Sequence, residues 1–209
     1  MLTNGTVVAR TDVNNGYAIV RIQPDGDVPH FTPGQHLTVG WFVEGVLIER
    51  PFSIASSPDE PQVELYVQDP PQGRVRLSPH GSGVLTLEGV PNDRDLLMVA
   101  SGTGIAPFIS MYRAFKGTQR WRSFTIIHGV RVQADLPYQD ELKGITYIPV
   151  VSREHWAGKM GHVQAAIEVA QLDRERTHAF ICGNGVMVAE VSQLFSGAGF
   201  THIHTEKYA

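Results

Sequence analysis

The stretch VASGTGIAPF at residues 99–108 has the residue types of a phosphate-binding turn. Gly102 and Gly104 would let a pyrophosphate approach the backbone, whose N–H groups bind phosphate at the start of a helix. Pro107 fits the first turn of a helix, but the usual dinucleotide fingerprint G-x-G-x-x-G has a glycine there. The spacing therefore indicates a dinucleotide site of a modified kind. The alternative, an ordinary strand-to-helix turn, stays open because short glycine motifs match by chance.

Cys182 is the only cysteine in the chain and precedes Gly183 at the end of an apolar run. Parallel sheets bind ligands at the carboxyl ends of their strands, so this thiol suits a ligand site; the alternative is a structural core cysteine. One cysteine excludes an internal disulfide and a cysteine-ligated iron–sulfur cluster, which needs about four thiolates. His202 and His204 would share one face of a terminal strand, but the spacing identifies no third ligand, so we expect no metal.

Two kinds of pattern divide the chain near residues 90–95, and we predict two domains, 1–92 and 93–209. The first part alternates short apolar runs with Gly/Pro turns, which is typical of an antiparallel barrel or sandwich. Its expected strands are 5–10, 16–22, 36–42, 46–54, 63–68 and 83–89. The second part alternates buried strands with helices, which favours a parallel sheet. Its expected strands are 96–100, 124–128, 145–151 and 179–182, and its expected helices are 105–116, 135–143, 161–171 and 185–196.

Composition excludes several classes of protein. The formal net charge of −4 gives no overall attraction to nucleic acid or anionic membranes. No apolar run has the length of a bilayer span, and the first residues lack the pattern of a signal peptide. We therefore expect a cytoplasmic protein, with a monomer as the default.

Four segments resemble, in order, motifs of the ferredoxin–NADP reductase family, and of its bacterial ferredoxin/flavodoxin reductases in particular. They are ERPFSIASSP (49–58), SGTGIAPF (101–108), FICGNGVMV (180–188) and HTEKYA (204–209), and FTPGQHL (31–37) and DLPYQDEL (135–142) also match. The resemblance implies a two-domain β + α/β fold. Its N-terminal part would be an antiparallel Greek-key β-barrel that binds flavin, and its C-terminal part a parallel-sheet, nucleotide-binding α/β domain.

The resemblance also implies a flavin site. Arg50 would bind the flavin phosphate, Phe52 would lie against one face of the isoalloxazine, and Ser53 would lie near flavin N5. A strand carrying Tyr66, Val67 and Gln68 would pass the ribityl chain, and the turn from Gly73 to Ser78 would face the second phosphate, with Arg74 or Arg76 assisting. Pro51 belongs to the same motif. The segment 78–95 is shorter than is usual in the family, so FAD is the first choice and FMN the alternative.

The nicotinamide nucleotide would bind in the second part of the chain. The implied contacts are Gly102, Thr103, Gly104, Pro107, Arg131, Ser152, Arg153, Gly183 and Met187, with Arg153 and Arg131 on the 2′-phosphate, where an Arg fork fits. His162 stands where the family often has another Arg, and NADPH is preferred over NADH. Ser53, Cys182, Glu206 and Tyr208 would be the catalytic residues. Cys182 would lie beside the nicotinamide. Tyr208 would stack on the flavin, in the place that the nicotinamide must take, and would move aside for it. Glu206 would assist proton delivery to the flavin or position the nicotinamide.

The implied activity is hydride transfer between NADPH and FAD, with single electrons passed to or from ferredoxin or flavodoxin. Such carriers are acidic, and Arg113, Lys116, Arg120 and Arg122 are candidates for a docking patch; ordinary solvated charges are the alternative. Two other functions stay open. One is a reductase component dedicated to an oxygenase or another acceptor, and the other is a slow regulatory module that binds flavin and nucleotide.

Overall fold

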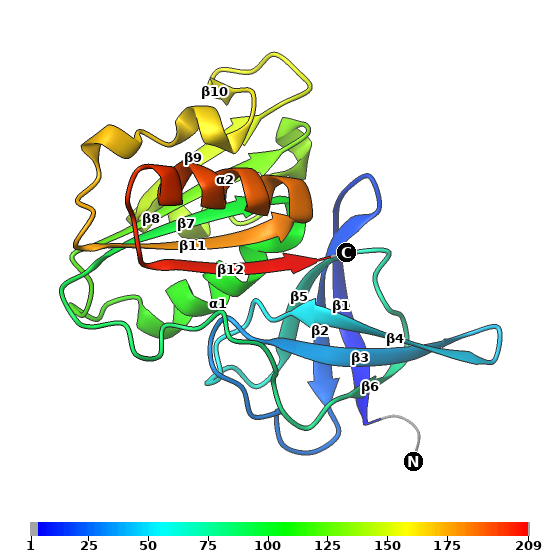
Figure 1. Ribbon diagram of the computed structural model, residues 1–209. Helices are drawn as coiled ribbons and strands as arrows, with labels where there is room; N and C mark the ends of the chain where they lie inside the picture. Colours follow the sequence, from blue (N-terminus) through cyan, green and yellow to red (C-terminus); the bar gives the residue numbers. More distant parts are fainter. Residues whose placement is uncertain (1–3, 209) are drawn as a thin grey trace. The chain divides into compact units, whose positions relative to one another are not determined.

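The computed structural model describes residues 4–208, which form two compact units (Figure 1). One unit contains the chain up to Leu87 together with Ala106–Lys116, and the other contains Glu88–Ile105 and the chain from Gly117 onward. The helix that follows the glycine turn therefore groups with the first unit. The division into functional domains at residues 92 and 93 stays a prediction.

The first unit is a six-stranded antiparallel sheet in the order β4-β3-β6-β1-β2-β5. Its strands are β1 (Gly5–Asn14), β2 (Tyr17–Pro24), β3 (His36–Val43), β4 (Val46–Ser53), β5 (Val63–Gln68) and β6 (Arg74–Leu77). The chain after β4 bridges back to β5 at Ile54 and Leu65, and the Ala55 N–H donates to the Glu64 carbonyl at 2.8 Å. These contacts join the two edge strands, so the sheet closes into a barrel.

The alternation of side chains in β2 explains how the barrel is filled. Ala18, Val20 and Ile22 are fully buried, whereas Arg21 and Gln23 face outward. Asn15 and Gly16 both have positive φ, 49° and 80°, as the two-residue turn of a tight hairpin requires between β1 and β2. Local sequence therefore sets this hairpin.

Two predictions for the first unit are wrong. Residues 83–89 do not form a strand, although Leu85 and Leu87 are buried at 1% and 2% exposure. A Cβ on Gly34 would lie 2.0 Å from the Leu85 carbonyl oxygen, so close packing against this backbone, rather than strand pairing, holds the segment. Conversely, residues 74–77, which we expected to lie in a turn, form strand β6, because Val75 and Leu77 alternate into the core.

The second unit is a parallel sheet in the order β10-β9-β8-β7-β11-β12. Its strands are β7 (Asp95–Ser101), β8 (Ser123–Val130), β9 (Thr146–Val151), β10 (Lys159–Met160), β11 (Thr177–Asn184) and β12 (Ile203–Tyr208). Helix α2 (Gly185–Gly197) lies over one face of this sheet (Figure 1). It packs Met187, Val191 and Phe195 into the core with Val99 and Ile181. The predicted strands and the predicted helix 185–196 are confirmed. The predicted helix 105–116 is confirmed as α1 (Ala106–Phe115), which grouped with the first unit.

Two further predicted helices are wrong. Residues 135–143 contain only parts of the 3₁₀ turns η2 (Gln133–Asp135) and η3 (Glu141–Gly144), and residues 161–171 contain η4 (Val163–Ala166) and η5 (Val169–Gln171). Pro137 keeps Leu136 extended, and Tyr138 has a φ of 63°, so no helix can run through. The apolar side chains are still buried, which is why their spacing was misleading.

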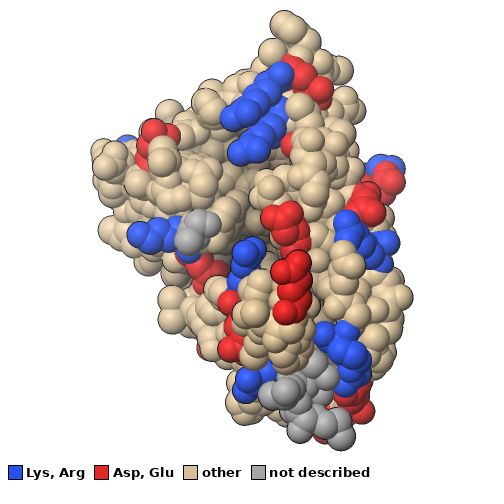
Figure 2. Space-filling view, turned by 90° about the vertical axis from the view of Figure 1, so that its right-hand side faces the viewer, with Lys and Arg blue, Asp and Glu red and all other residues tan. Residues whose placement is uncertain are grey.

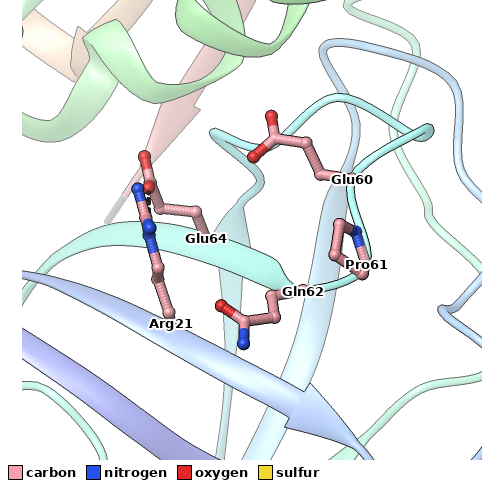
Figure 3. A pocket seen from close by; sticks show the side chains of 5 residues that line it. All are labelled: Arg21, Glu60, Pro61, Gln62 and Glu64. Carbon is pink, nitrogen blue, oxygen red and sulfur yellow. Dashed lines mark hydrogen bonds and ion pairs between the residues drawn. The ribbon is translucent and has the colours of Figure 1, made fainter.

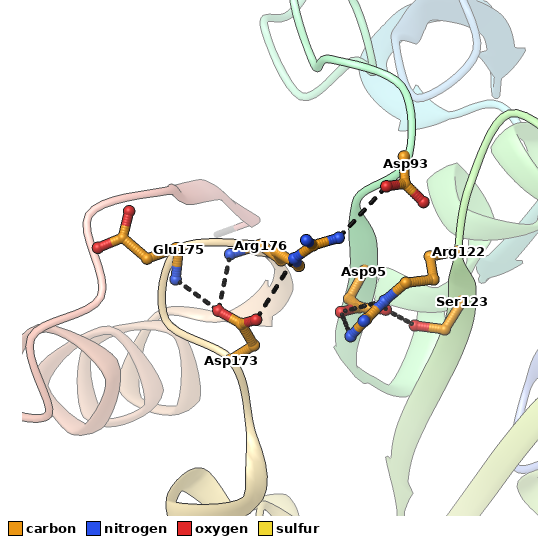
Figure 4. Close-up of polar contacts among 7 residues, drawn as sticks. All are labelled: Asp93, Asp95, Arg122, Ser123, Asp173, Glu175 and Arg176. Carbon is orange, nitrogen blue, oxygen red and sulfur yellow. Dashed lines mark hydrogen bonds and ion pairs between the residues drawn. The ribbon is translucent and has the colours of Figure 1, made fainter.

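Charged side chains join the amino ends of the central parallel strands (Figure 4). Asp95, which opens β7, accepts from Arg122 Nε at 3.0 Å and from Ser123 Oγ at 2.6 Å. Arg176, just before β11, pairs with Asp93 at 3.2 Å and with Asp173 at 3.6 Å. These ion pairs lie at the ends of the strands opposite to the carboxyl ends, where the glycine turn follows β7.

Basic and acidic side chains are interspersed on the face in Figure 2, in keeping with the small net charge. Among residues 4–208, no helix is both long and apolar enough to cross a membrane.

Candidate functional site

The glycine turn lies at the carboxyl end of β7, where the sequence places it. Gly102 has a φ of 53°, a left-handed conformation that glycine adopts without strain. A Cβ on Gly104 would lie 2.3 Å from the Cys182 carbonyl oxygen, closer than any side-chain carbon can approach. Both glycines are therefore required by the backbone geometry itself.

This turn adjoins the point where the order of the strands reverses. β7 pairs with β8 on one side and with β11 on the other, and the chain continues outward in both directions. Register places Cys182 opposite Ala100, so Ser101, Gly102 and Gly183 end neighbouring strands together. Open parallel sheets bind ligands at such a reversal. The structure thus brings together the predicted residues of two separate motifs.

Ser101 links the ends of β7, β11 and β12. Its hydroxyl oxygen accepts from the Asn184 backbone N–H at 3.1 Å, and its carbonyl accepts from the Tyr208 hydroxyl at 2.5 Å. Asn184 in turn caps α2, because its side chain accepts from the Met187 N–H at 2.9 Å. Sequence reasoning missed Ser101 and Asn184, whose roles depend on contacts across the sheet.

Cys182 and Glu206 are direct neighbours in the register of β11 and β12. Burial, with a smaller contribution from the Glu206 carboxylate, raises the pKa of the Cys182 thiol well above its usual value. Cys182 is 1% exposed, so it is a protonated, buried thiol and not a reactive thiolate. Tyr208 is 40% exposed and ends β12 opposite Asn184. Ala209, the last residue of the predicted C-terminal motif, lies outside the described residues.

Arg131 and Arg153 follow the neighbouring strands β8 and β9. The Arg153 N–H donates to the Arg131 carbonyl at 2.9 Å, and the Ser152 N–H donates to Val130 at 3.1 Å. Both arginines are exposed. The structure therefore places these predicted phosphate contacts side by side. His162 follows β10, the next strand of the same sheet.

The predicted flavin motif occupies the end of β4 in the first unit. Arg50 is exposed, and its guanidinium carbon lies 5.9 Å from the centre of the Trp41 ring. Within residues 4–208, no carboxylate pairs with Arg50. Phe52 is half-buried against Trp41, with ring centres 6.0 Å apart, and Pro51 and Ser53 flank it. Arg50 is thus a cation available for an anionic ligand.

The remaining predicted flavin contacts lie on β5 and around β6. Tyr66 and Val67 are each 2% exposed, and Gln68 is exposed. Gly73 has a φ of 64° and begins the turn into β6. The sequence did not anticipate that Arg74 pairs with Asp25 and also donates to the Thr6 hydroxyl at 2.7 Å.

Ser78 and Arg76 also have partners within the protein. The Ser78 hydroxyl accepts from the Thr38 N–H at 3.1 Å and donates to the His80 carbonyl at 3.1 Å. Arg76 lies 3.5 Å from Glu49. A phosphate at this place would therefore have to replace existing bonds, unlike a phosphate at Arg50.

A small pocket in the first unit lies among residues that the sequence did not single out. It is lined by Arg21, Glu60, Pro61, Gln62 and Glu64 (Figure 3). Glu64 is 2% exposed and pairs with Arg21 at 2.9 Å and with Arg113 of α1 at 2.9 Å. The Glu64 carboxylate in this pocket is already paired, and one of its partners, Arg113, belongs to α1. We therefore interpret the pocket as part of the contact between α1 and the barrel and not as a ligand site.

The predicted docking patch is wrong for Arg113. Its side chain is 11% exposed and is held by Glu64, so it cannot present a charge to a partner. Arg122 is bound to Asp95, and Arg120 stacks on Trp121 at 4.3 Å.

His202 and His204, the two histidines considered as metal ligands, lie next to His178. Both rings stack with His178, with centres 4.3 Å and 5.5 Å apart. Within residues 4–208, no group of three or more His, Cys, Asp or Glu side chains is placed to hold a metal ion.

Comparison with known proteins first defines the class. Residues 98–193 match the family model of the oxidoreductase NAD-binding domain. The fold resembles that of a ferredoxin NADP⁺ reductase from Neisseria gonorrhoeae, solved with bound FAD and NADP. The TM-score is 0.87 at 24% identity, and the match covers 98% of each chain. The predicted fold, an antiparallel barrel with a parallel α/β unit, is confirmed.

The relatives then identify the family. Flavodoxin/ferredoxin–NADP reductase of Escherichia coli is 31% identical over 190 residues, or 77% of each chain. Ferredoxin–NADP reductase B of Sorangium cellulosum is 31% identical over 219 residues, or 88% of each. The chain belongs to the flavodoxin/ferredoxin–NADP reductase family.

Proposed function

We propose that this protein is an NADPH-dependent flavin oxidoreductase that transfers hydride between NADPH and FAD and exchanges single electrons with a ferredoxin or flavodoxin. The observation that carries the proposal is the glycine turn of Gly102 and Gly104 packed on the Cys182 carbonyl, where the strand order reverses. A ligand bound there would meet backbone groups and the buried, protonated thiol of Cys182. These groups suit the binding of a nicotinamide nucleotide, whereas a protonated thiol is a poor nucleophile.

The residues of the second unit fit the nicotinamide nucleotide. Added Cβ atoms on Gly104 and Gly183 would lie 2.3 Å and 2.2 Å from neighbouring protein atoms, so the backbones at the ends of β7 and β11 approach closely here. The backbone N–H groups of the turn, at the start of a helix, would bind the pyrophosphate. Thr103 and Pro107 belong to the same turn motif, and Met187 is buried in the core of the second unit. The exposed guanidinium groups of Arg131 and Arg153, with Ser152 between the strands, would bind the 2′-phosphate. Cys182 would contact the nicotinamide as a neutral thiol.

The residues of the first unit fit a flavin with a phosphate. Arg50, which lacks a carboxylate partner among the described residues, would bind that phosphate, and the half-buried Phe52 would contact the ring. Pro51, Ser53, Tyr66, Val67 and Gln68 would line the same site, with Ser53 donating toward flavin N5. Gly73, Arg74 and Ser78 are weaker candidates because the side chains of the last two are already bonded.

Bound FAD would supply the redox chemistry, taking an electron pair from NADPH and passing electrons on one at a time. The protein itself would orient the nicotinamide and shield it from solvent. The protonated Cys182 adds no charge beside the nicotinamide, Glu206 is the group able to hold a proton near it, and Tyr208 covers the turn. The acidic carrier, a cytoplasmic location, a monomeric state and the absence of nucleic-acid or membrane partners are further parts of this proposal.

The test is an absorbance spectrum of the purified protein, followed by anaerobic titration with NADPH and, separately, NADH. We expect a flavin spectrum, release of FAD and not FMN on denaturation, and bleaching by NADPH at lower concentration than by NADH. Steady-state reduction of ferredoxin and flavodoxin then identifies the carrier. A protein that takes up no flavin would refute the proposal. Reduction of an oxygenase component but of neither carrier would favour the dedicated reductase instead.

A further inference from the structure

His128 is a buried histidine that none of the proposed roles uses. It lies on β8, is 0% exposed, and sits between Ala100 of β7 and Pro149 of β9 in the register. Its Nε2 lies 2.8 Å from the carbonyl oxygen of Gly102, and its Nδ1 lies 3.1 Å from the Tyr147 hydroxyl. All of these residues belong to the second unit. A side chain from the middle of the sheet therefore reaches the glycine turn.

The chemistry of the three groups sets the direction of both hydrogen bonds. A carbonyl oxygen only accepts, so His128 Nε2 carries the proton and donates it to Gly102. The neutral ring then accepts at Nδ1, and the Tyr147 hydroxyl donates to it. Burial lowers the pKa of His128 to about 4, although the Gly102 carbonyl and Asp135 act in the opposite direction. Burial also raises the pKa of Tyr147, so this chain of bonds keeps its protons at neutral pH.

The bond to Gly102 sets the orientation of the next N–H group. In a trans peptide the C=O and the following N–H point in opposite directions. Because the Gly102 carbonyl is turned toward a fully buried imidazole, the Thr103 N–H is turned away from the sheet. The preceding carbonyl, that of Ser101, is held by Tyr208 at 2.5 Å. Two successive peptides of the turn thus bond to side chains from two other strands, and of these two side chains only His128 is buried.

We propose that His128, itself held by Tyr147, is a positioning residue that keeps the Gly102–Thr103 peptide turned so that its N–H faces the pyrophosphate of the nicotinamide nucleotide. The inference rests on the proposed function, because it requires that the turn binds this nucleotide. It differs from a packing role, since it predicts loss of pyrophosphate recognition without loss of the neighbouring 2′-phosphate contacts.

The experiment compares two ligands by isothermal titration of the holoprotein at pH 7.5. NADP⁺ contains the pyrophosphate, and adenosine 2′-monophosphate lacks it but keeps the adenine and the 2′-phosphate. For His128→Leu we expect NADP⁺ to bind about tenfold more weakly, with adenosine 2′-monophosphate within about twofold of wild type. His128→Gln, whose amide nitrogen can reach the same carbonyl, should recover most of the affinity. Tyr147→Phe should lose about two- to fivefold for NADP⁺ alone.

His178→Leu is the matched control, since it removes another buried histidine from the same sheet, at the position opposite Leu96 on β7. It should bind both ligands as wild type does. If His128→Leu binds NADP⁺ within twofold of wild type, or weakens both ligands equally, the positioning role is wrong while the proposed function stands. If wild type itself binds no NADP⁺, both are wrong. If His128→Leu does not fold, the same two titrations of Tyr147→Phe test the positioning role. A loss of affinity for NADP⁺ alone supports this role, and unchanged affinity for NADP⁺ contradicts it.

Discussion

The Tyr208 hydroxyl donates a hydrogen bond of 2.5 Å to the Ser101 carbonyl, which joins the end of β12 to the first residue of the glycine turn. The family resemblance implies that the nicotinamide takes the place of the Tyr208 ring on the flavin. In that case this bond must break on binding. Tyr208→Phe keeps the ring and removes the bond, so we expect NADP⁺ to bind about fivefold more tightly, as a hydrogen bond of about 1 kcal/mol implies. Titration of both proteins measures this. Unchanged or weaker binding would mean that Tyr208 does not compete with the nucleotide.

Gly104→Ala should disrupt nucleotide binding, because the new Cβ would meet the Cys182 carbonyl oxygen at 2.3 Å. The strands or the turn must shift, and we expect a loss of about 1–3 kcal/mol in the free energy of unfolding. The KM for NADPH should rise at least about tenfold through misplaced turn amides. Gly197→Ala in α2 is the control, since nothing lies within 4 Å of its added Cβ. Equal behaviour of the two variants would contradict the close approach.

Arg153→Gln should lower the preference for NADPH over NADH. The guanidinium is exposed beside Arg131, where it would bind the 2′-phosphate that NADH lacks. We expect the KM for NADPH to rise about 10- to 100-fold, with the KM for NADH unchanged, since a charge-assisted hydrogen bond contributes about 1.5–3 kcal/mol. Lys143→Gln, which removes an exposed lysine paired with Asp140, is the control. Parallel increases for both nucleotides would place Arg153 elsewhere in the site.

Arg113→Met should destabilise the first unit strongly. It leaves the buried Glu64 carboxylate with one cation instead of two, and breaking a buried pair costs about 3 kcal/mol. Arg21→Met removes the more exposed partner of the same carboxylate, whose side chain is 53% exposed, so the loss should stay below about 1 kcal/mol. Urea unfolding of both variants gives the comparison. Similar losses would show that burial does not distinguish the two arginines.

Stability should fall as the pH drops from about 6.5 toward 4, partly because of His178. Burial, together with His202, His204 and Arg94, lowers the pKa of His178 to about 4 in the folded protein. An unfolded histidine binds its proton near pH 6.5. Protons therefore bind the unfolded state first in this window, and the free energy of unfolding decreases as they do.

His178→Phe tests this pH dependence, because phenylalanine keeps the stacking and does not titrate. We expect the difference in urea midpoint between pH 8 and pH 5 to shrink in the variant. An unchanged difference would assign the pH dependence to other groups, such as His128.

Local patterns were sufficient for most of the elements and for the motifs. Short apolar runs between Gly/Pro turns identified β2 and β5, and two glycines with a proline identified the turn before α1. The same patterns gave wrong strands and helices where apolar side chains are buried in segments that form neither a strand nor an α-helix. Leu85 and Leu87 are buried in an irregular segment, and Leu136 and Val163 are buried in or beside 3₁₀ turns.

Residues close together in the chain were enough to predict most of the strands, both α-helices, the glycine turn and the family. Which distant side chains meet at that turn depends on how the strands pair. Gly104 must be glycine because the carbonyl of Cys182, 78 positions later, occupies the space of its Cβ. His128 reaches Gly102 only because β7 and β8 pair in one register. Such contacts follow from strand pairing across the sheet, so they cannot be predicted from the spacing of residues along one segment.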